Sequence, residues 1–194
     1  VEGAAERFMI EALAKKLQID LRKHGVSVLS TEGLNFDAFA PLFGKDALNV
    51  RVAVVSDADP ETPAEFPKLS DALSLSTAAM SIKSLENDFV RTFFAQKTFE
   101  YDLALQEKNR ELMLSALKEL HPGIAEDLKA MVDAAASDDK PRVLFNGMFD
   151  RGEGKKNVQK GAYGQALAQR ISDAGTNFIV PPYIADAIDY TVAG

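Results

Sequence analysis

Hydrophobic and polar positions in the first sixty residues alternate between helical and strand spacing. Apolar residues recur at helical intervals over residues 4–17, which predicts an amphipathic helix. A second helix is predicted over 35–42, where Gly44 follows as a stop signal. Short apolar runs at 26–29 and 51–56 predict strands, and the second run is continuous enough to be buried on both faces.

The opening Val1-Glu2-Gly3 is interpreted as the end of a strand that leads into the first helix. Strand, helix, strand, helix and strand in succession predict a parallel α/β sheet with right-handed crossovers. Because the chain starts in a strand and without methionine, we also expect it to be a fragment of a longer polypeptide, cut at a domain boundary.

The pattern loosens after Asp59, where Pro60, Pro63 and Pro67 predict a loop. Residues 88–105 then combine β-branched and aromatic residues, and they predict a strand that turns into a helix.

Amphipathic helices are predicted at 108–120 and 124–136, where they form a small helical hairpin inserted into the sheet domain or appended to it. Two more helices are expected at about 161–171 and at 184–192, the last one after Pro181 and Pro182. The predicted organisation is an α/β core, a helical insertion or subdomain, and a C-terminal part with a lysine loop, at residues 1–102, 103–150 and 151–194.

Composition removes several classes of protein. The chain has no cysteine, which excludes disulfides, thiolate metal sites and cysteine nucleophiles and fits a cytoplasmic protein. It has no apolar run near the roughly 20 residues that cross a bilayer, so no membrane span is expected. The net charge of −7 counts against simple binding of nucleic acid, but less against an enzyme that first recruits metal ions.

Acidic residues gather where the predicted strands end. Glu2 and Glu6 flank the first helix turn, and Asp57 and Asp59 follow the 51–56 strand, where alternation in an extended segment would point both the same way. The carboxyl ends of parallel strands form the usual functional edge of such sheets. Hard oxygen ligands at this density suit Mg²⁺, Mn²⁺ or Ca²⁺.

Each acidic pair also has a structural interpretation. An Asp-x-Asp after a strand is common in solvent-exposed loops, and Glu2 and Glu6 could serve as helix N-terminal acids favoured by the helix dipole. The occurrence of both pairs in one chain favours the metal site.

These motifs resemble the Toprim domain of topoisomerases, primases and related nucleases. The resemblance rests on Val1-Glu2-Gly3 with Glu6, a turn ending in Gly33, and Ser56-Asp57-Ala58-Asp59. Later segments are similar to the overcoming lysogenization defect (OLD) family of nucleases, in which Toprim follows an ATPase domain; these segments span residues 97–103, 160–163 and 178–184. The implied fold is a Toprim-type parallel-sheet core flanked by helices, with an additional small helical subdomain.

The resemblance also implies a function and residue roles. Glu2, Asp57 and Asp59 would hold one or two divalent cations, Mg²⁺ or Mn²⁺, with Ca²⁺ able to bind. Glu6 and Glu100 would complete the shell of the second metal, and Lys160 would approach the scissile phosphate. The implied activity is a metal-dependent DNA endonuclease that uses a two-metal mechanism. The implied partners are DNA, an upstream ATPase domain of the same polypeptide and a second copy in a full-length homodimer.

Lys160 on its own would be read as a solvated surface residue, since it follows Lys155 and Lys156 in a polar stretch. These two lysines and Arg151 could instead form a local basic strip that touches the DNA backbone. Asp102, two residues after Glu100, could assist the site.

The sequence lacks the residues that rival functions would need. Topoisomerase chemistry needs a nucleophilic tyrosine, and the tyrosines here, Tyr183 among them, fit packing roles better. No Walker loop is present, so this chain should not bind ATP in that manner. The alternative from another class is a non-catalytic acidic module, either metal-binding or receiver-like. The helical region at 103–136 does not suit a receiver.

Overall fold

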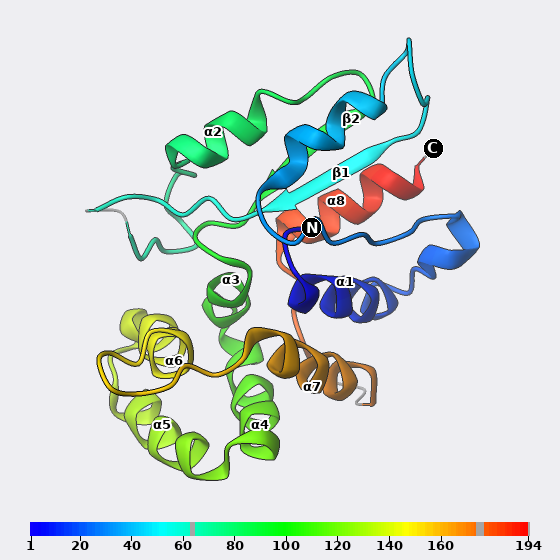
Figure 1. Cartoon of the computed structure of the whole chain (residues 1–194). Helices are drawn as coiled ribbons and strands as arrows, with labels where there is room; N and C mark the ends of the chain where they lie inside the picture. The colour runs from blue at the N-terminus through cyan, green and yellow to red at the C-terminus, as the bar shows by residue number, and fades with distance from the viewer. Residues whose placement is uncertain (63–64, 174–176, 194) are drawn as a thin grey trace.

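The structure, a computed structural model, describes residues 1–62, 65–173 and 177–193 and joins a small parallel sheet to a group of helices (Figure 1). The sheet consists of β1 (Val52–Ser56) and β2 (Val90–Phe94), paired in parallel with Val52 opposite Val90 and Ser56 opposite Phe94. Both strands match their predictions. Of the predicted loop, Pro63 lies outside the described residues.

The two faces of this sheet are covered by different elements. Val54 and Phe94 pack into a hydrophobic cluster with α2 (Thr77–Lys83), a helix that the sequence pattern did not predict. Phe93 points to the opposite face, because side chains alternate along a strand, and there its ring contacts Tyr190 of α8 (Pro182–Val192). Covering on both sides explains the continuous apolar run of β1.

The N-terminal segment lies in parallel beside residues 29–33. The amino group of Val1 donates to the Leu29 carbonyl at 3.0 Å, and the Thr31 and Gly33 N–H groups donate to Val1 and Glu2 carbonyls at 3.0 and 2.9 Å. No strand forms at residues 26–29, so this prediction is wrong. The pairing begins at Leu29, the last residue of the predicted strand, and involves only Val1 and Glu2 of the opening segment. This short pairing nonetheless places Glu2.

The predicted helix over 35–42 is also wrong. The segment forms two 3-10 turns, η2 (Asn35–Ala38) and η3 (Ala40–Leu42), and the chain is extended again at Phe43. Pro41 explains the difference, since a proline inside a helix removes one backbone donor and disfavours the helical conformation of the residue before it.

The remaining elements are mostly helices that share one core. The predicted helices appear as α1 (Ala4–Lys16), α3 (Phe99–Leu105), α4 (Arg110–Leu120), α5 (Pro122–Ala134), α7 (Lys160–Asp173) and α8, and α6 (Lys140–Phe149) is additional. Short 3-10 turns link them: η1 (Leu21–His24), η4 (Glu107–Asn109) and η5 (Ser137–Asp139). Leu13, Leu103, Leu117, Leu144 and Leu167 are all buried in the common core. The three-part division of the chain remains a prediction.

Helices α1 and α7 cross closely at Gly164. A Cβ atom at this position would lie 2.9 Å from the Ala5 Cα and 3.0 Å from its Cβ. Only a residue without a side chain allows this approach, which brings the first turns of α1 and α7 together. Those turns carry Glu6 and Lys160.

Gly164→Val is therefore expected to destabilise the protein by about 1–3 kcal/mol, because the added atoms meet backbone rather than a flexible side chain. Denaturant unfolding measures the change. Gly161→Ala, in the same helix but with nothing within 4 Å of its Cβ, should shift stability by less than about 1 kcal/mol. Equal effects of the two substitutions would contradict the close crossing.

The structure confirms the α/β class. Its parallel sheet is smaller than the sheet that the alternation of strand and helix signals predicted. Within the described ranges, none of the helices has both the length and the apolar character needed to cross a membrane.

Candidate metal and phosphate site

The candidate site forms where β1 ends. Glu2 is held there by its Oε1 atom, which accepts hydrogen bonds from the Ser56 hydroxyl at 2.5 Å and the Asp57 N–H at 2.9 Å. The Glu2 carboxylate is therefore attached to the carboxyl end of β1 even though its own segment pairs elsewhere. Ser56 is a site residue for which the sequence pattern suggested no role.

Asp57 links β1 to α3. Its Oδ1 atom accepts the Phe99 N–H at 2.8 Å, at the start of α3, where the Thr98 hydroxyl accepts from the Tyr101 N–H. This places Glu100, in the same helix turn, beside Asp57. Glu100 is almost fully buried, with 3% of its surface exposed.

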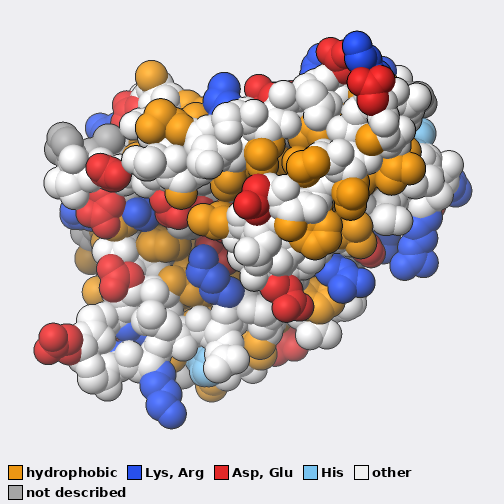
Figure 2. Space-filling model, turned by 45° about the horizontal axis from the view of Figure 1, so that its top comes forward, with side chains coloured by type: hydrophobic (Ala, Val, Ile, Leu, Met, Phe, Trp, Pro, Cys, Tyr) orange, Lys and Arg blue, Asp and Glu red, His pale blue; other side chains and the backbone are white. Residues whose placement is uncertain are grey.

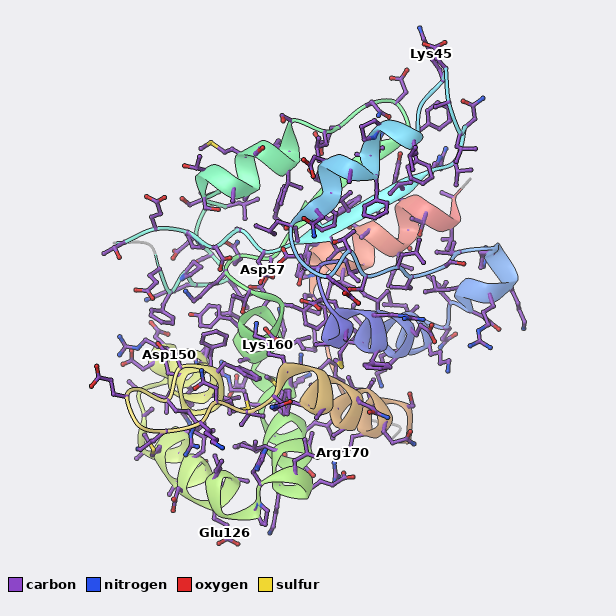
Figure 3. All side chains as sticks on the ribbon, viewed as in Figure 1. Lys45, Asp57, Glu126, Asp150, Lys160 and Arg170 are labelled. Carbon is purple, nitrogen blue, oxygen red and sulfur yellow. The ribbon has the colours of Figure 1, made fainter. Side chains whose placement is uncertain are left out.

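Lys160 reaches the cluster from α7. Its Nζ atom lies 2.9 Å from Glu100 Oε2 and 5.7 Å from the centre of the Phe149 ring. Figure 3 shows Asp57 and Lys160 close to α3, at the same end of β1. The Lys160 side chain is exposed, as the surface interpretation predicts, but its ammonium group pairs with a buried carboxylate, so its role stays a prediction.

Glu6 completes the cluster from the first turn of α1. It is buried, and a Cβ atom on Gly3 would lie 3.0 Å from Glu6 Oε2, so glycine leaves room for this carboxylate. Burial raises the pKa of Glu6, and repulsion from Glu100 adds to the shift.

The electrostatics show that these groups form one cluster. Burial, followed by repulsion from Glu2 and Glu100, raises the pKa of Asp57 well above its usual value. Burial alone would lower the pKa of Lys160, but attraction to Glu100, and further to Asp57 and Glu6, raises it. Lys160 therefore stays charged and partly compensates the carboxylates.

Asp59 joins the cluster in a different way from the one predicted. Its backbone is in the left-handed region, with φ of 42°, so the alternation of an extended segment does not apply at this position. Its N–H donates to the Lys97 carbonyl at 3.1 Å. Partial burial and repulsion from Glu2 raise the pKa of Asp59, although the residue is exposed.

The donor set fits a hard divalent cation, although no cage is preformed. Among the described residues, no three Asp, Glu or His side chains lie close enough together to share an ion. Yet Glu100 Oε1 is buried with no hydrogen-bond partner in the protein, which is rare for a carboxylate oxygen. An unpartnered buried oxygen beside further carboxylates is the chemistry that Mg²⁺ and Mn²⁺ select.

Two neighbouring predictions can be compared with the contacts. Asp102 accepts N–H bonds from Gln96 at 2.8 Å and Lys97 at 3.2 Å, so it holds the loop after β2. Burial raises the pKa of Asp102 to about 7 despite those bonds. In the predicted basic strip, Arg151 donates to the Lys156 carbonyl at 3.0 Å, while Lys155 and Lys156 are exposed. Contact of this strip with DNA stays a prediction.

The chain was compared with known families, proteins and structures. Residues 1–59 match the family model described as "Overcoming lysogenization defect protein-like, TOPRIM domain". A comparison with curated protein sequences found no match.

Two solved structures resemble the chain over almost its whole length. The C-terminal region of the Burkholderia pseudomallei OLD protein is 26% identical, with a TM-score of 0.69, and the match covers 99% of this chain and 94% of that one. The C-terminal region of the Xanthomonas campestris pv. campestris OLD protein, phased with mercury, is 25% identical, with a TM-score of 0.65 and coverage of 99% and 92%.

Proposed function

This chain has the Toprim domain and the fold of the C-terminal region of OLD proteins, and from that premise we propose that it cleaves DNA as a divalent-metal-dependent endonuclease. The observation that carries the proposal is the cluster at the end of β1, where half-buried Glu2 and buried Glu100 both repel Asp57 and the Lys160 ammonium group pairs with Glu100. Such repulsion opposes folding, so the cluster indicates a function.

Glu2, Glu6, Asp57, Asp59 and Glu100 would hold the cations in this proposal. When bound, Mg²⁺ or Mn²⁺ would activate a water molecule and neutralise charge on the phosphate and on the leaving oxygen. Ca²⁺ would bind to the same oxygens. The bonds from Ser56 to Glu2 and from Phe99 to Asp57 fix the direction of two of these carboxylates, so less reorganisation is needed when a cation arrives.

Lys160 would bind the scissile phosphate in this scheme. Its side chain is 46% exposed while its partner Glu100 is buried, so the ammonium group lies between the carboxylate cluster and solvent. A cation bound by Glu100 would take over the role of Lys160 as counter-ion. The lysine could then turn to an incoming phosphate and stabilise the charge that develops there.

DNA is the proposed substrate, with the exposed Lys155 and Lys156 as backbone contacts. Since the similar structures are described as C-terminal regions, we also propose an upstream ATPase domain in the same polypeptide, as in the OLD family, and a homodimer of the full-length protein. Cytoplasmic localisation follows from the same proposal.

A non-catalytic acidic metal-binding module is the second candidate. The same cluster would serve such a module, because the buried, unpartnered Glu100 Oε1 atom can bind a cation whether or not DNA is present. Such a module would bind cations without cutting DNA, which separates it from the nuclease in one assay.

Nicking of supercoiled plasmid tests the proposal. We expect cleavage with Mn²⁺ or Mg²⁺, none after the metal is removed with a chelator, and recovery when excess Mn²⁺ is restored. Heat release on titration with Ca²⁺ measures cation binding independently. Binding of Ca²⁺ without cleavage under any metal would support the non-catalytic module and reject the nuclease.

A further inference from the structure

A surface hollow of about 360 Å³ lies where α8 ends against the sheet. Figure 1 shows the C-terminal end of α8 beside the start of β1, whereas Asp57 follows the end of that strand. The hollow is therefore at the opposite end of the sheet from the candidate site. Two arginines, two aspartates and two aromatic residues line it: Arg51, Arg91, Asp186, Asp189, Phe93 and Tyr190.

Both arginines of the hollow converge on one tyrosine ring. Arg51 directly precedes β1, and Arg91 lies in β2 on the same face as Phe93, because side chains two apart along a strand point the same way. The guanidinium carbons of Arg51 and Arg91 lie 5.5 and 4.7 Å from the centre of the Tyr190 ring. The Tyr190 hydroxyl donates to the Phe89 carbonyl at 2.9 Å, which fixes the ring. The tyrosine therefore holds both guanidinium groups beside the hollow.

The charges around the hollow are exposed and lack partners. Within residues 1–62, 65–173 and 177–193, no ion pair involves either arginine or either aspartate of the hollow. Arg51 donates a bond of 3.4 Å to the Tyr190 carbonyl, but a guanidinium group has five N–H donors. The surface thus presents two positive and two negative groups that can each bind an opposite charge on a partner.

A partner for this surface must carry charges of both signs. A DNA backbone would be attracted by the arginines but repelled by the aspartates, so the hollow fits phosphate poorly. A second copy of the chain fits it, because a two-fold contact brings one patch against itself, and the arginines of each copy then meet the aspartates of the other. Tyrosine and arginine are also the residues that most often dominate the binding energy of protein interfaces.

We propose that two copies of this chain associate through the hollow at the end of α8, in a two-fold symmetric contact. The arginine pair of each copy binds the aspartate pair of the other, and the Tyr190 rings lie at the centre of the contact. This contact lies away from the carboxylate cluster, so it does not depend on the nuclease proposal. It gives the homodimer proposed above a contact within this chain.

Charge reversal tests the pairing. Sedimentation velocity of the wild-type chain should show a dimer at high concentration that dissociates on dilution. One double variant combines Arg51→Asp with Arg91→Asp, and the other combines Asp186→Arg with Asp189→Arg. Each should weaken the dimer by about 100-fold or more, because like charges then face each other. An equimolar mixture of the two variants should dimerise again, since every reversed pair meets its complement, and this recovery also shows that both variants are folded.

Lys83→Asp combined with Lys118→Asp is the matched control. These exposed lysines lie on α2 and α4, so the variant changes the net charge as much as the arginine variant does and should leave the dimer within about twofold of wild type. A wild-type chain that stays monomeric, a dimer that neither reversal weakens, or a mixture that stays monomeric would each overturn the proposal. If the wild type is monomeric and the arginine variant binds duplex DNA less tightly, the hollow is a DNA contact instead. Plasmid nicking, measured alongside, decides on the nuclease separately.

Discussion

Asp57→Asn is expected to reduce metal-dependent DNA cleavage by about 100-fold or more, the size of loss seen when one charge-stabilising group is removed from an active site. Asp57 is coupled to several neighbours, with Glu2, Glu100, Lys160 and Asp59 all acting on it. Asparagine keeps the shape and an oxygen that can accept the Phe99 N–H, but it is a weak ligand for a divalent cation. Quantified plasmid nicking in Mn²⁺ measures the loss.

The same substitution should leave the metal-free protein at least as stable as wild type at neutral pH. Burial and two nearby carboxylates disfavour the charge on Asp57, and the asparagine removes that charge without removing the Phe99 bond. Asp57→Ala should also abolish cleavage without unfolding the protein, because no core packing is lost. Urea unfolding gives the free energies. Cleavage that survives in both variants would point to a contaminating nuclease and reject this site.

Lys160→Met is expected to slow cleavage by about 100-fold while cation binding stays intact or becomes tighter. Methionine keeps an apolar stem beside Phe149 but has no charge for the phosphate. Loss of the ammonium group also removes the counter-ion of Glu100, so a bound cation meets less competition at that carboxylate. Single-turnover cleavage and calorimetric titration with Ca²⁺ separate the two effects. Lys160→Ala should likewise slow cleavage and leave cation binding intact.

Lys155→Met and Lys156→Met provide the control for charge. Both lysines are exposed in the loop before α7, so each substitution changes the net charge equally without touching the cluster. Each substitution should lower DNA affinity only modestly, and the difference in affinity from wild type should disappear at high salt. If Lys160→Met behaved like these two variants, Lys160 would be a surface lysine in function, and its pairing with Glu100 would be purely structural.

Sequence reasoning located most helices and both strands. The periodic segments that became α1, α4, α5, α7 and α8 were predicted because each has one apolar face and recognisable ends. The short α2 and the helix α6 were missed. The segment around Pro41 was mistaken for a helix, because apolar spacing outweighed the effect of the proline.

Within the candidate site, only some of the residues could be inferred from local pattern. Glu2, Glu6, Asp57 and Asp59 stand at predicted strand ends, and the position alone makes them candidates. Glu100 and Lys160 were proposed from family resemblance, since nothing in their local sequence separates them from surface residues.

By itself, therefore, the sequence determined the α/β class and the acidic edge of the sheet, because both depend on short-range periodicity and on where strands end. The tertiary structure alone decided that Lys160 pairs with Glu100, which lies sixty residues earlier in the chain. It also decided that Gly164 lets α7 approach α1. The physical reason is that burial and charge coupling depend on helix packing between distant segments, which no local window of residues contains.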